Sequence, residues 1–220
     1  IVARSIVTYY LAEVADEVTG SCNYQIASEE TEPLDGWPYD GFFAKLAANP
    51  EWNGAEAGKA LVEAYADSYN GGTQGDNDTT QSVIDLGRFA EFKIAADAFT
   101  QQLQSNPAYT EKVTEAIHAS QSYAESDHKD MVDFIDQVTA RITDQPVLDA
   151  AAALKAALSD KVVIASAVTG SGLENSRGLA VWLPTWGSQS LMQRYKELNW
   201  ASATQWDEFV TVLSSTSGDI

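Results

Sequence analysis

The sequence predicts an α/β fold that carries a mostly helical subdomain. Segments rich in β-forming residues alternate with amphipathic segments near both ends of the chain, whereas the middle shows only the apolar period of helices. A polar, glycine-rich stretch at 71–81 predicts an exposed loop between two of these segments. We therefore expect an α/β portion over 1–86, an inserted or appended helical subdomain over 87–160, and closing strands with C-terminal helices over 161–220.

The first portion divides into elements by its apolar periodicity. Residues 5–18 predict a helix, and the alternating NYQIAS at 23–28 predicts a strand. Two stretches with a 3.6-residue period, 39–50 and 54–70, predict two further helices. The short apolar run SVIDL, which follows the glycine-rich loop, is typical of a buried strand.

The middle and the end of the chain show a simple order. Apolar spacing predicts three helices over 87–105, 107–124 and 129–142, with Pro107 in the first turn of the second and Asp127 as the cap of the third. A fourth, alanine-rich helix should begin near Pro146. The last elements that we expect are strands at 161–170 and 178–184 and helices at 190–199 and 203–215.

Composition limits the classes of partner. The chain has 32 acidic and 13 basic residues and a net charge of −19, which disfavours nucleic acid and anionic lipid as partners and suits a basic peptide or simply solubility. No apolar run approaches the roughly 18–20 residues of a membrane span, and IVARSIVTYY lacks the order of a signal peptide. The single cysteine, Cys22, excludes an internal disulfide.

Several motifs occur in one order along the chain. They are EVADEVTGSCNYQIASEE with DGWPYD, then TTQSVIDLGRFAEF, HKDMVDFIDQV, and finally GLAVWLP with RYKELNWASATQWDEF. In this order they resemble the part of the clostripain-like cysteine peptidases that follows the catalytic cysteine. The resemblance implies a caspase-like sheet with flanking helices and, in active relatives, cleavage after Arg or Lys by a Cys/His dyad.

The same resemblance indicates that the dyad is missing from this chain. Matching the family's Asp-Ala-Cys motif through Glu13 places Ser5, Ile6 and Val7 under its three residues, and valine cannot be a nucleophile. The family's histidine segment would lie before Ile1. We therefore expect a non-catalytic domain.

A slipped alignment would make Cys22 the nucleophile instead. Cys22 falls just before a predicted strand, where the family has an ordinary small residue. His118 and His128 lie in the predicted helical section, where a helix-face or capping role is the simpler interpretation. A lone cysteine with two histidines is a weak signal for a peptidase dyad.

Asp35 is the candidate substrate-binding residue. The resemblance places it where the family can have a carboxylate that lines the pocket for a basic side chain, and a carboxylate pairs well with a guanidinium. The alternative is a turn residue, because Leu-Asp-Gly-Trp is typical of a turn. No residue of this chain is assigned as catalytic.

Other polar and aromatic groups allow ligand hypotheses. Calcium is possible because active relatives can require it, with Glu29, Glu30 and Glu32 or Asp76 and Asp78 as ligands, although neither run has EF-hand spacing and solvated charge explains both. No cofactor is certain. The tryptophans near the C-terminus could stack on a sugar, but core packing is the simpler interpretation; they are Trp182, Trp186, Trp200 and Trp206.

The predicted half-sheet determines which partners we expect. Unpaired strand edges invite pairing, so the remainder of the same polypeptide or a partner chain should complete the sheet, and the lone chain should not be a stable monomer. The alternative function is a structural or assembly protein that uses this fold as a building block. We expect an extracellular or cell-envelope location.

Overall fold

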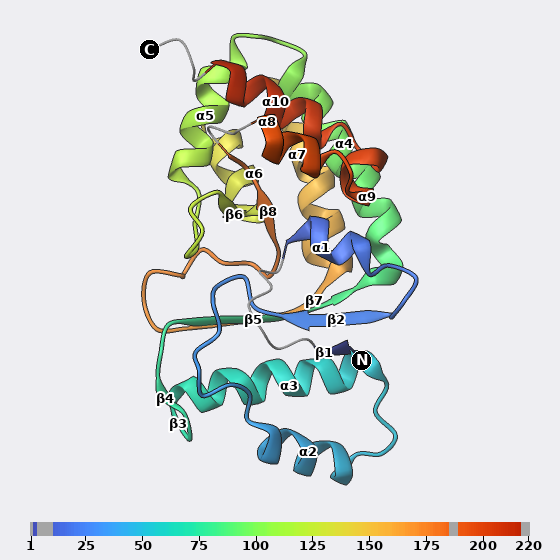
Figure 1. The fold of residues 1–220 in the computed structure, drawn as a ribbon, viewed down its shortest axis with the longest axis vertical. Coiled ribbons are helices and arrows are strands. Elements are labelled where there is room, and N and C mark those ends of the chain that lie inside the picture. Colours follow the sequence, from blue (N-terminus) through green and yellow to red (C-terminus); the bar gives the residue numbers. More distant parts are fainter. Residues whose placement is uncertain (1, 4–10, 185–188, 217–220) are drawn as a thin grey trace.

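A four-stranded sheet forms the centre of the molecule. The computed structural model describes residues 2–3, 11–184 and 189–216 (Figure 1). The strand order is β1-β2-β5-β7, and its members are β1 (Val2–Ala3), β2 (Tyr24–Ala27), β5 (Thr79–Asp85) and β7 (Val163–Thr169). The pair β1–β2 is parallel, and the pairs β2–β5 and β5–β7 are antiparallel. The predicted α/β class is confirmed.

Two helices cover one face of this sheet, the lower face in Figure 1. They are α2 (Tyr39–Ala48) and α3 (Gly54–Tyr69). Asn53 and Glu56 form a reciprocal capping box at the start of α3, which supplies partners for backbone N–H groups that the helix itself cannot satisfy. The core on this face includes Ile26, Trp37, Phe42, Leu61, Val62, Tyr65, Tyr69 and Val83.

The opposite face carries a thicker helical layer (Figure 1). Its helices are α1 (Ala12–Glu17), α4 (Phe89–Gln104), α5 (Tyr109–Ala119), α6 (Met131–Thr139), α7 (Gln145–Ala157), α8 (Gln189–Tyr195), α9 (Asn199–Ala203) and α10 (Trp206–Thr216). A 3₁₀ turn, Leu86–Arg88, precedes α4, and a π turn, Leu158–Val162, follows α7. The core here combines residues from α1, the sheet and helices as late as α10. The division at 86/87 and 160/161 stays a prediction.

The middle section contains a strand that the periodicity did not predict. β6 (His128–Asp130) pairs antiparallel with β8 (Ala180–Trp182), so the middle is not entirely helical. The predicted helix over 129–142 begins only at Met131, and its cap is Asp130 rather than Asp127, because the Asp130 carboxylate accepts from the Asp133 amide. His128 therefore lies on a strand, which corrects the helical placement.

Other boundaries also differ from the predictions. The glycine-rich stretch contains a hairpin of β3 (Asn70–Gly72) and β4 (Gly75–Asp76), and β5 begins at Thr79 rather than Ser82. The helix predicted over 107–124 runs only from Tyr109 to Ala119, because Ser120 has an extended backbone; Pro107 lies in the preceding turn. Of the helix predicted over 5–18, the described part is α1.

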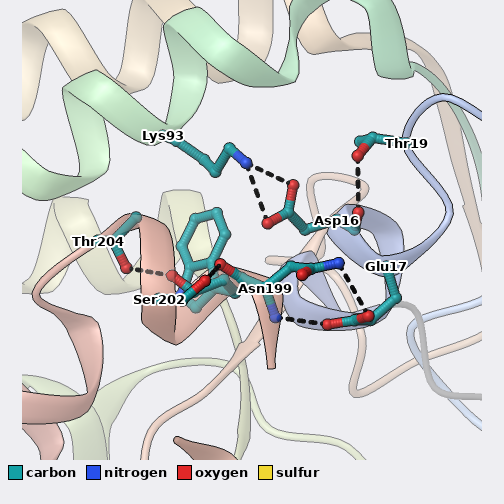
Figure 2. A network of polar contacts seen from close by, with 8 residues as sticks. Asp16, Glu17, Thr19, Lys93, Asn199, Ser202 and Thr204 are labelled. Carbon is teal, nitrogen blue, oxygen red and sulfur yellow. Dashed lines mark hydrogen bonds and ion pairs between the residues drawn. The ribbon is translucent and has the colours of Figure 1, made fainter. Parts of the chain in front are cut away.

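Polar contacts connect the short helix α1 to α4 and α9 (Figure 2). The Lys93 ammonium lies 2.8 and 3.1 Å from the two carboxylate oxygens of Asp16, whose side chain is fully buried. The Glu17 carboxylate accepts from both the backbone N and the Nδ2 of Asn199, at 2.6 and 3.0 Å. A helix of six residues is marginal alone, so these contacts determine where α1 lies.

The C-terminal tryptophans pack the core, as predicted. Trp200 and Trp206 are completely buried and form an edge-to-face pair, with ring centroids 5.9 Å apart. The Trp206 indole N–H donates to the backbone oxygen of Trp182, which is also buried. Trp186 lies outside the described residues. Among the described helices, none combines the length and apolar character that a membrane span needs.

Candidate functional site

The loop that follows β2 is held at its start by one side chain of the neighbouring strand. The Thr80 hydroxyl accepts hydrogen bonds from the backbone N–H groups of Glu29 and Glu30, at 2.8 and 3.1 Å, and lies 2.9 Å from the Ser28 hydroxyl. β5 therefore fixes the direction in which the chain leaves the sheet. This edge is where β2 ends, and the carboxyl ends of parallel strands are the usual place for ligands in an open α/β sheet.

The tip of the loop is fixed through its backbone. Gly36 has φ of 72°, and its carbonyl accepts from the Tyr69 hydroxyl and from Gln74 Nε2, both at 2.8 Å. Gln74 Nε2 also donates to the Asp35 carbonyl at 2.9 Å. The Trp37 indole N–H donates to the Glu32 carboxylate at 2.7 Å. Side chains of α3 and of the β3–β4 turn thus hold the loop against the sheet.

Asp35 is exposed at this tip, while its backbone is held. Among the residues that the structure describes, none hydrogen-bonds or ion-pairs with its carboxylate. Burial is the main cause of the raised pKa of the Tyr69 hydroxyl. The nearby negative charges of Asp35 and then of Glu32 raise this pKa further. A cavity of about 590 Å³ lies beside the loop, between Trp37, Tyr39, Asp67 and Gln74. The arrangement presents a free carboxylate on a rigid backbone.

A pair of buried acids lies behind the start of the loop. Glu29 accepts from the Tyr123 hydroxyl at 2.9 Å and from the Gly178 amide at 3.1 Å, while Asp130 accepts from the amides of Arg177 and Asp133 at 2.6 and 2.7 Å. Burial, followed by the charge of Asp130, raises the pKa of Glu29 well above its ordinary value. Burial raises the pKa of Asp130 to about 6, although its backbone donors favour the ionised form. The pair joins the loop to β6 and to the segment before β8.

A third buried acid, Glu13, lies on α1. One oxygen, Oε1, accepts from the Tyr195 hydroxyl at 2.6 Å and from the Trp182 amide at 3.1 Å, whereas the buried Oε2 has no hydrogen-bond partner among the described residues. Burial raises the pKa of Glu13 to about 7 despite these donors. Glu13 lines a cavity of about 570 Å³ together with residues of α1, β6, β8 and α8, including His128, and with Leu198 just before α9.

The candidate dyad residues do not come together in the described structure. Cys22 precedes β2, at the opposite end of that strand from the Asp35 loop, and its thiol lies 4.0 Å from the Val18 carbonyl. His118 is exposed near the end of α5, and His128 lies on β6. Val7, the residue matched to the nucleophile, lies outside the described residues.

Four of the five acidic residues considered as calcium ligands accept from separate protein donors, and the fifth, Asp76, is exposed on β4. Glu29 contacts Tyr123, Glu30 accepts from the Ala124 amide, and Glu32 accepts from Trp37. Asp78 accepts from the Ser171 amide at 2.8 Å. No group of three or more His, Cys, Asp or Glu within the described ranges is placed to hold a metal ion. These residues therefore do not fit a calcium site.

The family model described as "Clostripain family" matches residues 10–213. The chain belongs to the clostripain family. No curated protein sequence matches the chain.

Solved structures of clostripain-family and related cysteine proteases have the same fold. A Bacteroides fragilis cysteine protease is 16% identical to this chain, with a TM-score of 0.65. The match covers 93% of this chain and 86% of the protease chain. A clostripain from Bacteroides thetaiotaomicron, in complex with a peptide inhibitor, is 15% identical with a TM-score of 0.68, and covers 92% of this chain and 86% of its own. An inactive zymogen C11 protease from Parabacteroides distasonis is 17% identical with a TM-score of 0.65, and covers 89% of this chain but 56% of its own. The resemblance to a caspase-like clostripain fold is confirmed.

The sequence analysis singled out Asp35 as a binding residue and Glu29 as a possible calcium ligand, but it did not single out Glu13 or Asp130. Glu13 could have been noticed because it lies in LAEVADEV, where a charged residue shares a helix with buried apolar neighbours. Asp130 precedes Asp133 by three residues, the spacing of an N-cap with its bonded amide. No local pattern links Glu13 to Tyr195, because 182 residues separate them.

Proposed function

We propose that this chain is a non-catalytic, peptide-binding domain of the clostripain family. The proposal rests on the position of Cys22, the only cysteine of the chain. Cys22 precedes β2, whereas the Asp35 loop follows β2. By the family resemblance, Val7 stands at the nucleophile position. A thiolate must lie beside the scissile carbonyl that the pocket presents, so Cys22 is misplaced for that role.

The ligand that we propose is a peptide with an arginine or lysine side chain. Asp35 supports this, because its carboxylate is unpaired among the described residues and its backbone is fixed by Gln74. A guanidinium could form two charge-assisted hydrogen bonds with such a carboxylate. The fixed backbone lowers the entropic cost of ordering the loop on binding.

A binding measurement tests this proposal directly. A labelled peptide with a single arginine is titrated into the wild type, Asp35→Asn and the matched control Asp149→Asn, which removes the same charge from an exposed site on α7. We expect Asp35→Asn to weaken binding about tenfold or more and Asp149→Asn to change it less than twofold. Equal affinities for all three proteins would contradict the pocket role.

Turnover of an arginine-amide fluorogenic substrate tests the absence of catalysis. We expect no turnover by this chain, with or without reductant and calcium, and no difference between the wild type and Cys22→Ser. Turnover that thiol alkylation or Cys22→Ser abolishes would overturn the non-catalytic proposal. Turnover that appears only after a second polypeptide is added would show that the chain contributes a pocket to a shared site.

A second candidate function is assembly, favoured by the edges of the main sheet. β1 and β7 are the outer strands, and most of β7 is only half-buried. Either edge could pair with the remainder of the polypeptide or with a partner chain, as exposed strand edges do. Sedimentation distinguishes the functions: a polymer that does not bind the arginine peptide favours assembly, whereas a stable 23.8 kDa monomer contradicts it.

We also propose an extracellular or cell-envelope location. One similar structure, 17% identical with a TM-score of 0.62, is described as a secreted C11 cysteine protease from Bacteroides thetaiotaomicron. The strongly acidic composition is compatible with that setting. Fractionation of the producing cells tests the proposal, and recovery of the chain only from the cytoplasm would contradict it.

A further inference from the structure

Two buried carboxyl groups, those of Glu29 and Asp130, contact each other behind the start of the Asp35 loop. Glu29 is 1% exposed and Asp130 is completely buried, and their side chains lie in hydrogen-bonding contact. An ionised carboxylate has no hydrogen to donate, and two carboxylates in contact repel each other. The contact therefore requires that the pair shares a proton.

Two consecutive backbone amides bind the pair from the segment that precedes β8. The Arg177 amide donates to Asp130 Oδ2 at 2.6 Å, and the Gly178 amide donates to Glu29 Oε2 at 3.1 Å. Each amide supplies a partner to an acceptor that burial has removed from water. Through these amides, both acids hold residues 172–177 against the end of the main sheet.

The Tyr123 hydroxyl binds the pair from the segment that precedes β6. It lies 2.9 Å from Glu29 Oε1 and 3.0 Å from the Ser176 hydroxyl. The apolar cluster around Tyr123 has three buried members, whereas the two main cores are much larger. Segments with few buried apolar contacts open locally at a lower free energy than the core does. The contacts with the acids are therefore important for two covering segments, residues 121–127 and 172–177.

No cation among the described residues forms an ion pair with Glu29 or Asp130. The negative charge of Asp133 on α6 contributes to the raised pKa of Asp130. The Arg177 guanidinium donates to two backbone carbonyls of its own segment instead of to the acids. The other charged or titratable residues on the surrounding elements are Glu30, Glu125, Asp127, His128, Lys129 and Glu174. The shared proton thus compensates the second negative charge of the pair.

We propose that the proton shared by Glu29 and Asp130 is a pH-sensitive switch: while it is bound, the two covering segments stay closed, and its loss to solvent at alkaline pH opens them. Opening lets water reach both carboxylates, which removes the cost of burying two like charges. The two main cores lie elsewhere, so the rest of the chain stays folded when the covering segments open.

The direction of the pH effect follows from which state binds the proton more tightly. In the open state the two solvated acids have their ordinary pKa values of 4.5 and 3.8. In the closed state, burial first and then the charge of Asp130 hold the pKa of Glu29 well above 4.5, and burial raises the pKa of Asp130 to about 6. Above pH 7, opening therefore releases one proton, and the ratio of open to closed molecules should rise about tenfold per pH unit until the pKa of Glu29 is reached.

Amide hydrogen exchange of the isotope-labelled chain, followed by NMR, measures this opening. The reporters are the amides of Arg177 and Gly178, which donate to the two acids, and the reference is the amide of Val83 in β5, a strand paired on both sides. After correction for the intrinsic exchange rate, we expect the protection of both reporters to fall about tenfold from pH 7 to pH 8. At each pH their protection should be at least tenfold below that of Val83, because the opening is local.

Two variants make the test specific. Glu29→Gln can donate to Asp130 as the protonated acid does but cannot ionise, so the protection of the reporters should change less than twofold from pH 7 to pH 8. Glu30→Gln is the matched control, because Glu30 is the next residue, is only half-buried and accepts from the Ala124 amide; it should keep the tenfold fall.

The carboxyl ¹³C signal of Glu29 in the wild type tests the proposal without any variant, and it should titrate above pH 7. Titration of this signal below pH 6, reporters as protected as Val83, or the same pH dependence in Glu29→Gln as in the wild type would each overturn the proposal. None of these results depends on Asp35, on peptide binding or on peptidase activity.

Discussion

The carboxylates on the two faces of the main sheet are in opposite situations. On the α2–α3 side, Asp35 is exposed, and the protein holds its backbone rather than its charge. Within the thicker helical layer, Asp16 and Glu13 are buried. Lys93 contacts both carboxylate oxygens of Asp16, whereas Tyr195 and the Trp182 amide donate only to Oε1 of Glu13. A carboxylate in the first region can therefore bind a cationic ligand at little desolvation cost. A carboxylate in the second region needs a protein partner for its charge, or its pKa is raised.

Removal of the cation at Asp16 should have the largest effect on stability. Lys93→Met leaves a fully buried carboxylate without its ion-pair partner, and we expect the free energy of unfolding to fall by about 2–3 kcal/mol. The matched control is Lys155→Met, which breaks the ion pair with Asp136 where both side chains are about half exposed, and should cost no more than about 0.5 kcal/mol. Urea denaturation measures both, and equal losses would contradict the contrast between buried and exposed acids.

The pH dependence of stability should show an intermediate effect. The pKa of Glu13 rises from 4.5 to about 7 on folding, so the folded state binds this proton more tightly than the unfolded state. Its stabilisation is complete below pH 4.5 and is lost as the pH rises through about 7. Glu13→Gln removes this loss, so its stability relative to the wild type should increase by about 1–3 kcal/mol from pH 5 to pH 8.

Denaturant midpoints of the two proteins at pH 5, 6, 7 and 8 provide the measurement. Glu29 and Asp130 also have raised pKa values, so a residual fall with pH should remain in Glu13→Gln. Parallel curves for the two proteins would show that Glu13 does not titrate in this range.

The smallest stability effect should come from Asp35→Asn. The side chain is exposed and unpaired among the described residues, so the free energy of unfolding should change by no more than about 0.5 kcal/mol. Thermal unfolding at pH 7 is sufficient to measure it. A loss above 1 kcal/mol would mean that Asp35 has a structural role, and the two faces would then differ less than proposed.

Local patterns predicted the elements whose apolar face is long. The strand β2 and the helices α2, α3, α4 and α7 lie close to their predicted ranges, because each repeats its period over several residues. β6 was missed because it has three residues and depends on β8, about fifty positions away. The apolar periodicity of one segment gives no information about a pairing strand so distant in sequence.

The candidate site was predictable only in part. The acidic turn around Asp35 is local chemistry, with Gly36 supplying the positive φ, and the sequence indicated it. The contacts that hold the turn come from Tyr69 and Gln74, more than thirty residues away. The buried acids depend on even longer separations, as for Glu29 and Gly178.

The short strand β8 has a consequence for how the native pairing is selected. Its register places Ala180 opposite Asp130 and Trp182 opposite His128, while the Trp182 amide reaches Glu13. A slip by one residue would exchange the faces of all three positions and withdraw the amide from Glu13 at the same time. The native register of β8 is therefore specified by Glu13, which lies 169 residues before Trp182, as well as by the pairing with β6.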